Sequence, residues 1–260
     1  WTQGSMIDLG TLPGGNPVTA TDISSAGQVV GFSASDREDG TGGLAFIWSK
    51  GVMTVLGTLG EAGASADAIS SSGRLAGTIL TAAGEYHAFV RDKGIVTDLG
   101  TLGGSFSQAF DINASGQVVG SSVTPEGGSH AFLWENGVMT DLGELGGPSG
   151  TGSQALGISS KGQVVGSSGQ RAFLWQRGVM TDLGTLGAGV AAAKSINDAG
   201  QVVGWSRDHA FLWSDGVMTD LGTLPGGSYS QALGINAAGE IVGFSETATH
   251  EEHATLWTRK

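Results

Sequence analysis

The sequence predicts an all-β fold, a six-bladed β-propeller with four-stranded antiparallel blades, and three observations carry this prediction. A stretch that reads HAFLWENGVMTDLG at 130–143 recurs closely at 171–184 and 209–222, and more loosely at 44–57 and 87–100. Successive repeats are 38 to 48 residues long, which is the size of one propeller blade. The 47 glycines recur at fixed places in the repeat, which indicates ordered turns rather than flexible linkers.

The recurring stretch is predicted to form a β-hairpin. In the copy at 130–143, the runs AFLW and VMTDL are rich in β-branched and aromatic residues, and Glu135–Gly137 separates them. Glycine takes a positive φ at little steric cost, as a tight hairpin turn requires. Each repeat therefore contributes one such hairpin to its blade.

Four strands can be placed in each repeat, and the third copy shows them well: Ile95–Leu99, Ser107–Ile112, Gln117–Ser121 and His130–Trp134. The runs QVVG and AFLW are apolar at successive positions, so both faces of the sheet must be covered, as they are between neighbouring blades. The strand that begins SQA carries small residues instead, which suits the innermost strand of a blade; these are Ala109, Ala155 and Ala232.

The repeats, aligned on the last Trp of AFLW, form a single predicted domain and span 1–48, 49–90, 91–134, 135–175, 176–213 and 214–257. The chain starts with a strand of the fourth type, Ser5–Leu9, whereas the last repeat ends with a strand of the third type. We therefore expect the N-terminal strand to complete the blade begun by Ser230–Trp257, with Trp1 close to Trp257. The second repeat departs most from the pattern, because Val90 ends its strand where other copies have Trp.

The composition excludes several classes of function. The net charge is −12, the pI is about 4.6 and the 12 Lys and Arg residues are scattered, so we expect neither a nucleic acid nor an anionic membrane as a partner. No apolar run approaches the length of a transmembrane helix. Without cysteine the chain has no disulfide bond, thiolate zinc site or cysteine nucleophile. Because it begins at Trp1 without an initiator Met or a signal-type segment, we expect a mature or excised fragment. We also expect a monomer.

The blocks AFLW, GVMTDLGTLGG, SQA and INASGQVVG recur in the same order along essentially the whole chain. They resemble the HAF family of bacterial extracellular repeats, named for the motif that stands here at His87–Phe89, His130–Phe132 and His209–Phe211. The resemblance implies a secreted or surface-exposed bacterial protein. It implies no particular reaction or ligand.

Two polar positions recur with the repeat, and each has a structural and a functional interpretation. One position holds His87, His130, His209 and His253. A ring of imidazoles could hold a metal or an anion, but on the third strand, away from the axis, each histidine is expected to bond a neighbouring loop instead. The DLG step supplies Asp8, Asp98, Asp141, Asp182 and Asp220. We expect each of these carboxylates to accept backbone N–H groups of the following glycine loop, the alternative being a ring of calcium ligands. We therefore expect no cofactor and no metal.

No nucleophile constellation stands out in the sequence: it has no G-x-S-x-G elbow, no phosphate loop with Lys and no H-E-x-x-H. A reaction centre or ligand site is asymmetric, so the residues that break the repeat are the candidates for function. They gather in the loop between the second and third strands, which varies in length. These variable loops and the TLGG loops should lie at one end of the blades, and the turns of constant length at the other.

The candidate ligand site combines aromatic, acidic and basic side chains of the variable and glycine loops: Asp36, Arg37, Glu38, Asp39, Glu85, Tyr86, Phe106, Arg207, Tyr229, His250, Glu251 and Glu252. Such a set suits a carbohydrate or protein ligand, and predicts a non-enzymatic extracellular binding or structural module. One rival hypothesis is a hydrolase or lyase that acts on a polysaccharide, with Asp36 or Glu38 and His250 as acid and base. Another is a spacer in a longer surface protein.

Overall fold

The computed structural model describes residues 6–12, 17–33, 43–56, 63–146, 151–187 and 189–258, and within these ranges it contains strands and turns but no helix. In the described ranges, accordingly, no helix is long and apolar enough to cross a membrane. The chain divides into two compact units, which are described separately: Trp1–Thr101 with Ser105–Gly116, and Leu102–Gly104 with Gln117–Lys260.

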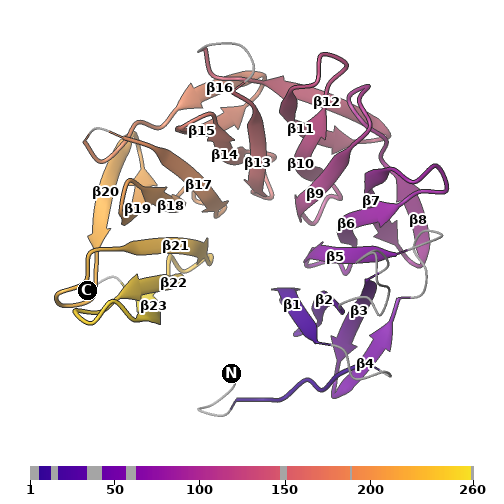
Figure 1. The fold of residues 1–260 in the computed structure, drawn as a ribbon, viewed down its shortest axis with the longest axis horizontal. Helices are drawn as coiled ribbons and strands as arrows, with labels where there is room; N and C mark the ends of the chain where they lie inside the picture. Colours follow the sequence, from indigo (N-terminus) through magenta and orange to yellow (C-terminus); the bar gives the residue numbers. More distant parts are fainter. Residues whose placement is uncertain are drawn as a thin grey trace. The chain divides into compact units, whose positions relative to one another are not determined.

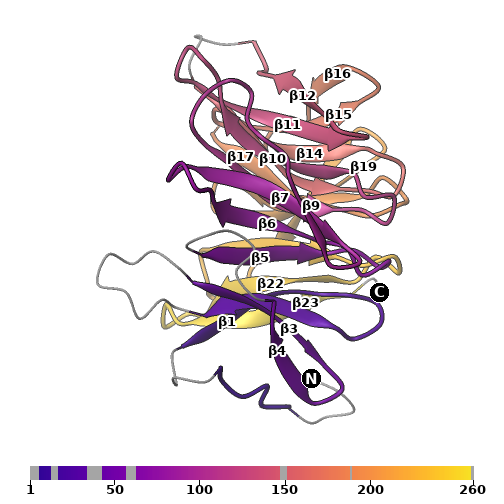
Figure 2. The same cartoon turned by 90° about the vertical axis from the view of Figure 1, so that its right-hand side faces the viewer.

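Six antiparallel sheets follow one another along the chain, and in each the strands that are neighbours in sequence are neighbours in the sheet (Figure 1). The predicted class, an all-β six-bladed β-propeller, is confirmed. Figure 2 shows the strands β5, β6 and β7 of the first unit side by side. The strands of the first unit are β1 (Val18–Ile23), β2 (Val29–Ser33), β3 (Leu44–Ser49), β4 (Val52–Val55), β5 (Ala64–Ile69), β6 (Leu75–Leu80), β7 (Tyr86–Asp92), β8 (Ile95–Asp98) and β9 (Ser107–Ile112).

The second unit contains the remaining strands. These strands are β10 (Val118–Val123), β11 (Ser129–Glu135), β12 (Val138–Gly143), β13 (Ser153–Ile158), β14 (Val164–Ser168), β15 (Arg171–Gln176), β16 (Val179–Asp182), β17 (Ala191–Ile196), β18 (Val202–Ser206), β19 (His209–Ser214), β20 (Val217–Gly222), β21 (Ser230–Ile235), β22 (Ile241–Glu246) and β23 (Glu252–Trp257). The four strands predicted for the third copy are confirmed, each to within two residues at either end.

The register corrects the alignment of the second repeat. Leu75 faces Arg91 in the pair β6–β7, just as Val118 faces Trp134 in the pair β10–β11. Arg91 therefore takes the place of the tryptophan, and the prediction that Val90 takes it is wrong by one residue. The position is only partly buried, so a long, amphipathic arginine side chain can replace the indole there.

The N-terminal segment differs from the prediction. The structure assigns no strand to Met6–Leu12, so the predicted strand Ser5–Leu9 is absent from the described part of that range. The last sheet, β21-β22-β23, has three strands. Trp1 lies outside the described residues, and the completion of the last blade by the N-terminal strand stays a prediction.

In five of the sheets, the glycine of the QVVG run is required because the first strand of the sheet passes very close to it. In the pair β13–β14, Ala155 faces Gly166, and a Cβ atom on Gly166 would lie 1.9 Å from the carbonyl oxygen of Gln154. The same near-contact occurs in four other sheets, at Gly31, Gly77, Gly204 and Gly243. The small residues predicted for the first strands are fully buried, and they are Ala109, Ala155 and Ala232. The alanine of the first strand and the glycine of the second thus allow the two backbones to come close together, and a larger residue at either position would keep them apart.

A buried serine at the start of a sheet's first strand links that sheet to the preceding one. In the second unit, the Oγ of Ser153 accepts the N–H of Ala131 at 2.8 Å and donates to the carbonyl oxygen of Gly143 at 2.6 Å. Ser230 makes the same two bonds to Ala210 and Gly222. These two serines are at most 2% exposed, so each satisfies two backbone groups that water does not reach.

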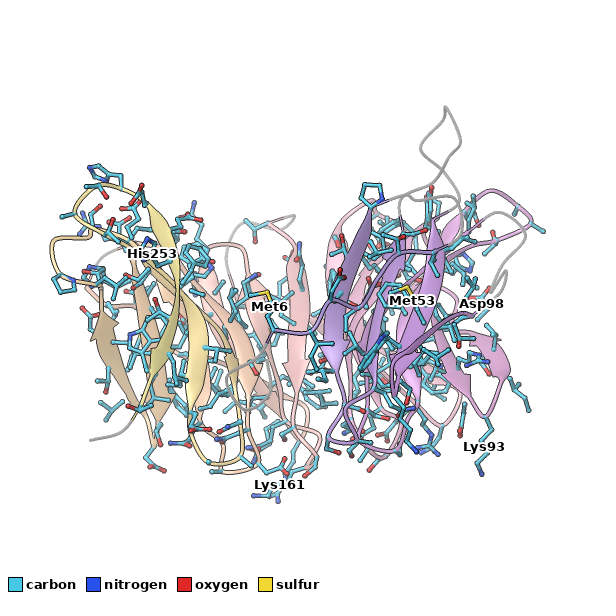
Figure 3. All side chains as sticks on the ribbon, turned by 90° about the horizontal axis from the view of Figure 1, so that it is seen from below. Met6, Met53, Lys93, Asp98, Lys161 and His253 are labelled. Atoms are coloured by element: carbon cyan, nitrogen blue, oxygen red, sulfur yellow. The ribbon has the colours of Figure 1, made fainter. Side chains whose placement is uncertain are left out.

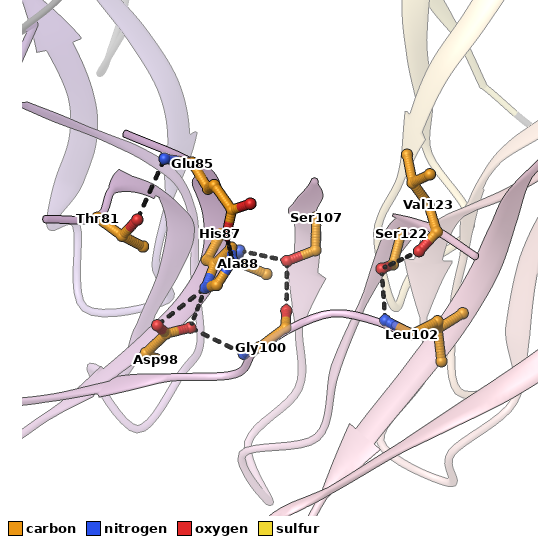
Figure 4. A network of polar contacts seen from close by, with 10 residues as sticks. All are labelled: Thr81, Glu85, His87, Ala88, Asp98, Gly100, Leu102, Ser107, Ser122 and Val123. Atoms are coloured by element: carbon orange, nitrogen blue, oxygen red, sulfur yellow. Dashed lines mark hydrogen bonds and ion pairs between the residues drawn. The ribbon is translucent and has the colours of Figure 1, made fainter. Parts of the chain in front are cut away.

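The first unit contains the same link. Figure 4 shows Ser107 between Ala88 and Gly100, with distances of 2.8 and 2.5 Å from its Oγ to the backbone nitrogen and oxygen. Ser107 is fully buried. The serine of the SQA block is therefore part of the architecture, which explains why it recurs with the repeat.

The first unit also holds a partly buried carboxylate on the strand β5. Asp67 lies where the register of β5 and β6 shifts between Ala66 and Ala68. Burial raises the pKa of Asp67 to about 6, although the hydroxyl groups of Ser65 and Thr78, at 2.9 and 3.5 Å, favour the charged form. The folded state therefore holds the proton of Asp67 more tightly than the unfolded state.

We expect the variant Asp67→Asn to be more stable than the parent protein at pH 8, by about 2 kcal/mol, and of similar stability at pH 4. The folded-state pKa is raised above the unfolded value of 3.8. The contribution of Asp67 to the free energy of unfolding is therefore complete below pH 3.8 and is lost as the pH rises through about 6. Urea denaturation at the two pH values measures the difference. An equal change at both values would contradict the prediction.

Asp198→Asn is the matched control with the opposite sign. Hydrogen bonds from Ser160 lower the pKa of Asp198, so its contribution is present at pH 8 and is lost as the pH falls through the folded-state pKa. We therefore expect this variant to be less stable than the parent protein at pH 8 and close to it in acid.

Candidate ligand site at the variable loops

The variable loops and the glycine loops lie at the same end of the strands, as predicted. In the second unit, the N–H of Leu102 donates to the Oγ of Ser122, and the N–H of Gly104 donates to the carbonyl oxygen of Val123, where the variable loop begins. In the first unit, Figure 3 places Lys93, in the turn between β7 and β8, and Asp98, at the end of β8, toward opposite ends of the sheet. Each unit thus has a loop end and a turn end.

The repeated histidines bond the aspartates of the same hairpin. The Nδ1 atom of His87 lies 2.9 Å from the Oδ2 of Asp98 (Figure 4), and the same pair of atoms is 2.8 Å apart in His130–Asp141 and 2.7 Å in His209–Asp220. The expectation that these three histidines bond a neighbouring loop is wrong. Phe89 faces Asp98 in the register, so a long side chain two residues before Phe89 reaches the aspartate diagonally across the two strands.

Covariation between the repeats carries the signal for this pairing. Where the histidine is replaced by Arg171, the aspartate is kept as Asp182, and the two side chains are 3.6 Å apart. Where the histidine is replaced by Leu44, the aspartate is replaced by Val55. In the five copies that contain both positions, the two are 11 residues apart, and the aspartate is kept where its partner is His or Arg and is lost where its partner is Leu. An inspection of each position alone does not show this relation.

The predicted role of the aspartates is confirmed. The Oδ1 of Asp98 accepts the N–H of Gly100 at 2.8 Å (Figure 4). The same bond, between 2.7 and 2.9 Å long, joins Asp8 to Gly10, Asp141 to Gly143, Asp182 to Gly184 and Asp220 to Gly222. In the part of the chain that the structure describes, no group of three His, Asp or Glu residues could hold a metal ion.

The candidates of the first unit gather around His87. Tyr86 and Phe106 form an isolated parallel bridge, and their ring centroids are 6.4 Å apart. The Oε2 of Glu85 lies 3.6 Å from the Nε2 of His87, a buried atom for which the described residues supply no hydrogen bond. The structure therefore brings Glu85, Tyr86 and Phe106 together. Asp36, Arg37, Glu38 and Asp39 lie outside the described residues.

In the second unit, Arg207 lines a small pocket. The pocket has a volume of about 260 Å³, and its walls are formed by Leu186, Ser206, Arg207, Asp208, His209 and Asp220. The Nε of Arg207 lies 3.5 Å from the Oδ2 of Asp208, and both side chains are largely exposed. The pocket therefore presents a cation, two carboxylates and an imidazole to solvent.

Tyr229 and His250 extend the same surface of the second unit. The N–H of Ser230 donates to the carbonyl oxygen of Asp208, and the N–H of Glu246 donates to that of Tyr229. The Oε2 of Glu246 is 3.6 Å from the Nδ1 of His250. Hydrogen bonds thus connect the turn of Arg207 to the loop of His250. The remaining candidates, Glu251 and Glu252, are exposed at the end of that loop and the start of β23.

Arg207 and His250 both replace a glycine at a positive φ. Arg207 has a φ of 57°, and the equivalent turn of the preceding sheet has Gly169 with a φ of 56°. His250 has a φ of 60° in a five-residue loop whose equivalents have Gly84 and Gly127 at φ values of 80° and 86°. A residue with a Cβ atom is strained in this conformation, where glycine is not. The backbone conformation at both positions therefore favours glycine, yet the chain has a large side chain at each of them.

Sequence reasoning missed Asp208, next to Arg207 in the same turn, and three further members of this surface that belong to strands or to the repeated motif. Phe244, on β22, lies with its ring centroid 5.9 Å from that of Tyr229. Glu246 accepts the hydroxyl hydrogen of Ser228 at 2.8 Å, and His209 contributes to the Arg207 pocket. The sequence could have indicated Phe244, because every second side chain of a strand lies on one face and Phe244 therefore shares a face of β22 with Val242.

No protein-family model and no curated protein sequence matches the chain. Among solved structures, it is similar to TolB from Acinetobacter baumannii, with 15% identity, a TM-score of 0.48 and coverage of 76% of this chain and 51% of TolB. It is similar to the β-propeller domain of the Trilobed protease from Pyrococcus furiosus, with 10% identity, a TM-score of 0.48 and coverage of 94% and 96%. A gluconolactonase from Xanthomonas campestris has 11% identity, a TM-score of 0.43 and coverage of 88% and 86%. The chain spans about half the length of TolB, and its own strand pairing, described above, defines the fold class.

Proposed function

We propose that the chain is a non-enzymatic binding module that holds a carbohydrate at the loop end of its second unit. The proposed site runs from Arg207 through Tyr229 to His250. The observation that carries the proposal is the presence of arginine and histidine at positive-φ positions where other repeats have glycine. Strain of this kind persists when the side chain has a use that outweighs the conformational cost.

The chemistry of the surface supports a sugar as the ligand. Arg207 and the carboxylates of Asp208 and Glu246 are donors and acceptors for hydroxyl groups, and the ring of Tyr229 supplies an apolar face. The pocket of about 260 Å³ beside Arg207 is slightly smaller than the ~300–1,000 Å³ of sites for drug-sized molecules. It therefore suits one sugar unit of a longer glycan.

We further propose, from the recurring HAF motif, that the chain belongs to the HAF repeats and works outside a bacterial cell or at its surface. An antibody against the chain, applied to intact cells and to lysed cells of the source bacterium, tests the location. Labelling of lysed cells alone, with no antigen in the culture medium, would contradict it.

The variant Arg207→Gly separates the proposed function from stability. We expect it to be at least as stable as the parent protein, because glycine relieves the strain at φ 57°, and to lose at least tenfold in affinity for glycans selected from an array by the parent protein. Calorimetric titration measures the affinity, and urea denaturation measures the stability. An array on which the parent protein binds no glycan contradicts the proposal, and binding only to proteins of a bacterial surface would replace the sugar by a protein ligand.

The variant Lys93→Gly is the matched control. Lys93 is also an exposed cation at a positive φ, 49°, but it lies in the turn between β7 and β8, at the turn end (Figure 3). We expect this variant to gain stability in the same way and to keep the full affinity. A loss of affinity in both variants would show that the charge of the chain, and not the Arg207 site, governs binding.

A further inference from the structure

A groove at the turn end of the second unit has the composition of a ligand site. In Figure 3, Lys161 marks this end, and His253 lies toward the opposite, loop end of the same unit. The groove has a volume of about 280 Å³ and lies between the third and fourth sheets. The residues that matter to its chemistry are Gln117, Glu135, Lys161, Trp175, Gln176 and Arg177.

Trp175 is the aromatic residue that lines the groove. It is at the end of β15, where it faces Val164 on one side and Met180 on the other. Together with Met180 it packs against the core of the second unit, yet the indole is only partly buried. Part of a rigid aromatic surface therefore remains open toward the groove, held in one orientation by the strands around it.

Paired polar side chains surround the indole. The Nε2 of Gln163 donates to the Oε1 of Gln176 at 2.7 Å, and the side-chain amide of Gln117 donates to the carboxylate of Glu135. Lys161 is fixed as well, because its Nζ donates to the carbonyl oxygen of Asp198 at 2.6 Å. Amide, carboxylate and ammonium groups are thus held in place beside an apolar face before any ligand arrives, which lowers the entropy cost of binding.

The junction between the fourth and fifth sheets lacks the long polar side chains that line the groove at Trp175. Trp213 occupies the same position in β19 and faces Val202 and Met218 in the same register. However, the residues equivalent to Lys161, Gln176 and Arg177 are Ala199, Ser214 and Asp215. The tryptophan therefore recurs as part of the fold, whereas the long polar side chains Lys161, Gln176 and Arg177 accompany Trp175 and have no counterparts of similar length at Trp213.

We infer that the groove at Trp175 is a second ligand site, which binds a single sugar ring with its C–H face on the indole and its hydroxyl groups on Gln176 and Glu135. An aromatic face with oriented amide and carboxylate groups matches the two surfaces that a pyranose presents, one of C–H groups and one of hydroxyls. The site is independent of the proposed function at Arg207, since it lies at the other end of the strands.

Saturation-transfer NMR with the methyl glycosides of glucose, galactose, mannose and N-acetylglucosamine tests the inference. We expect transfer from the parent protein to the ring protons of at least one glycoside, a loss of at least fivefold in Trp175→Ala and in the milder variant Gln176→Ala, and an unchanged signal in Trp213→Ala and Lys93→Gly. Absence of transfer to all four glycosides overturns the inference. So does an equal loss in Trp175→Ala and Trp213→Ala, or a signal that Gln176→Ala leaves intact if Trp175→Ala does not fold.

The variants also distinguish this site from the proposed one. A signal lost in Arg207→Gly and kept in Gln176→Ala would support the loop-end site and overturn the groove. A signal lost in Gln176→Ala and kept in Arg207→Gly would support the groove and would give no evidence of sugar binding at Arg207. Each site can therefore fail while the other stands.

Discussion

Replacing Gly166 by alanine is expected to destabilise the protein by at least about 3 kcal/mol. The new Cβ atom would lie 1.9 Å from the carbonyl oxygen of Gln154 and 3.0 Å from the Cα of Ala155. Both obstacles are backbone atoms, so no side chain can rotate away to make room. The strands β13 and β14 must separate, which weakens their hydrogen bonds and disturbs the buried layer around Val165 and Phe173.

Urea denaturation followed by tryptophan fluorescence measures this effect, and Gly146→Ala is its control. Gly146 is exposed, no atom lies within 4 Å of its ideal Cβ position, and its φ is not in the left-handed region. The control is expected to change the stability by less than about 0.5 kcal/mol. If Gly166→Ala were as mild as the control, the close approach of the two strands would not exist in solution.

The variant Ser153→Ala is expected to lose about 3 kcal/mol of stability. Its hydroxyl group serves the N–H of Ala131 and the carbonyl oxygen of Gly143, and both backbone groups lose that partner at a site that is 2% exposed. Each buried polar group left without a bond costs about 1–3 kcal/mol. The loss exceeds that of an ordinary hydrogen bond because one side chain satisfies two groups.

Hydrogen exchange gives a local measurement for the same variant. The amide proton of Ala131 should exchange at least tenfold faster in Ser153→Ala than in the parent protein, beyond the change that the global stability explains. Ser115→Ala, which removes an exposed hydroxyl group, should leave both measurements unchanged. Similar losses in Ser107→Ala and Ser230→Ala would confirm that the three links are equivalent, and a neutral result in all three would contradict the link.

Much of the fold could be predicted from the sequence because each strand-forming and turn-forming segment occurs in several copies. A single copy of QVVG or AFLW is too short to distinguish a strand from a helix segment, but six copies with turn glycines between them are not ambiguous. The prediction failed where one copy differs from the rest. Arg91 hid the end of β7, because an alignment on tryptophan cannot recognise an arginine at the same position.

The candidate site was predicted in part, and there is a physical reason why some of its features could be predicted and others could not. Arg207, Tyr229 and His250 were found because they interrupt the repeat in exposed loops, and hydrogen bonds connect them in the second unit. Burial raises the pKa of Asp67, which lies at a shift in the register of β5 and β6, and the alternation of residues along a strand reveals neither feature. The groove at Trp175 was overlooked because its tryptophan recurs, and only its less regular neighbours distinguish it.

The serine links have a consequence for how such a chain can change its length. Ser153 and Ser230 each contribute a side chain from their own sheet, and they bond only backbone atoms of the sheet before it. The bonded atoms are therefore the same whatever residues the preceding copy carries. Tandem duplication or deletion of one whole copy by recombination would restore both serine bonds without a compensating mutation, so the number of copies can change in evolution while this link between adjacent copies is kept.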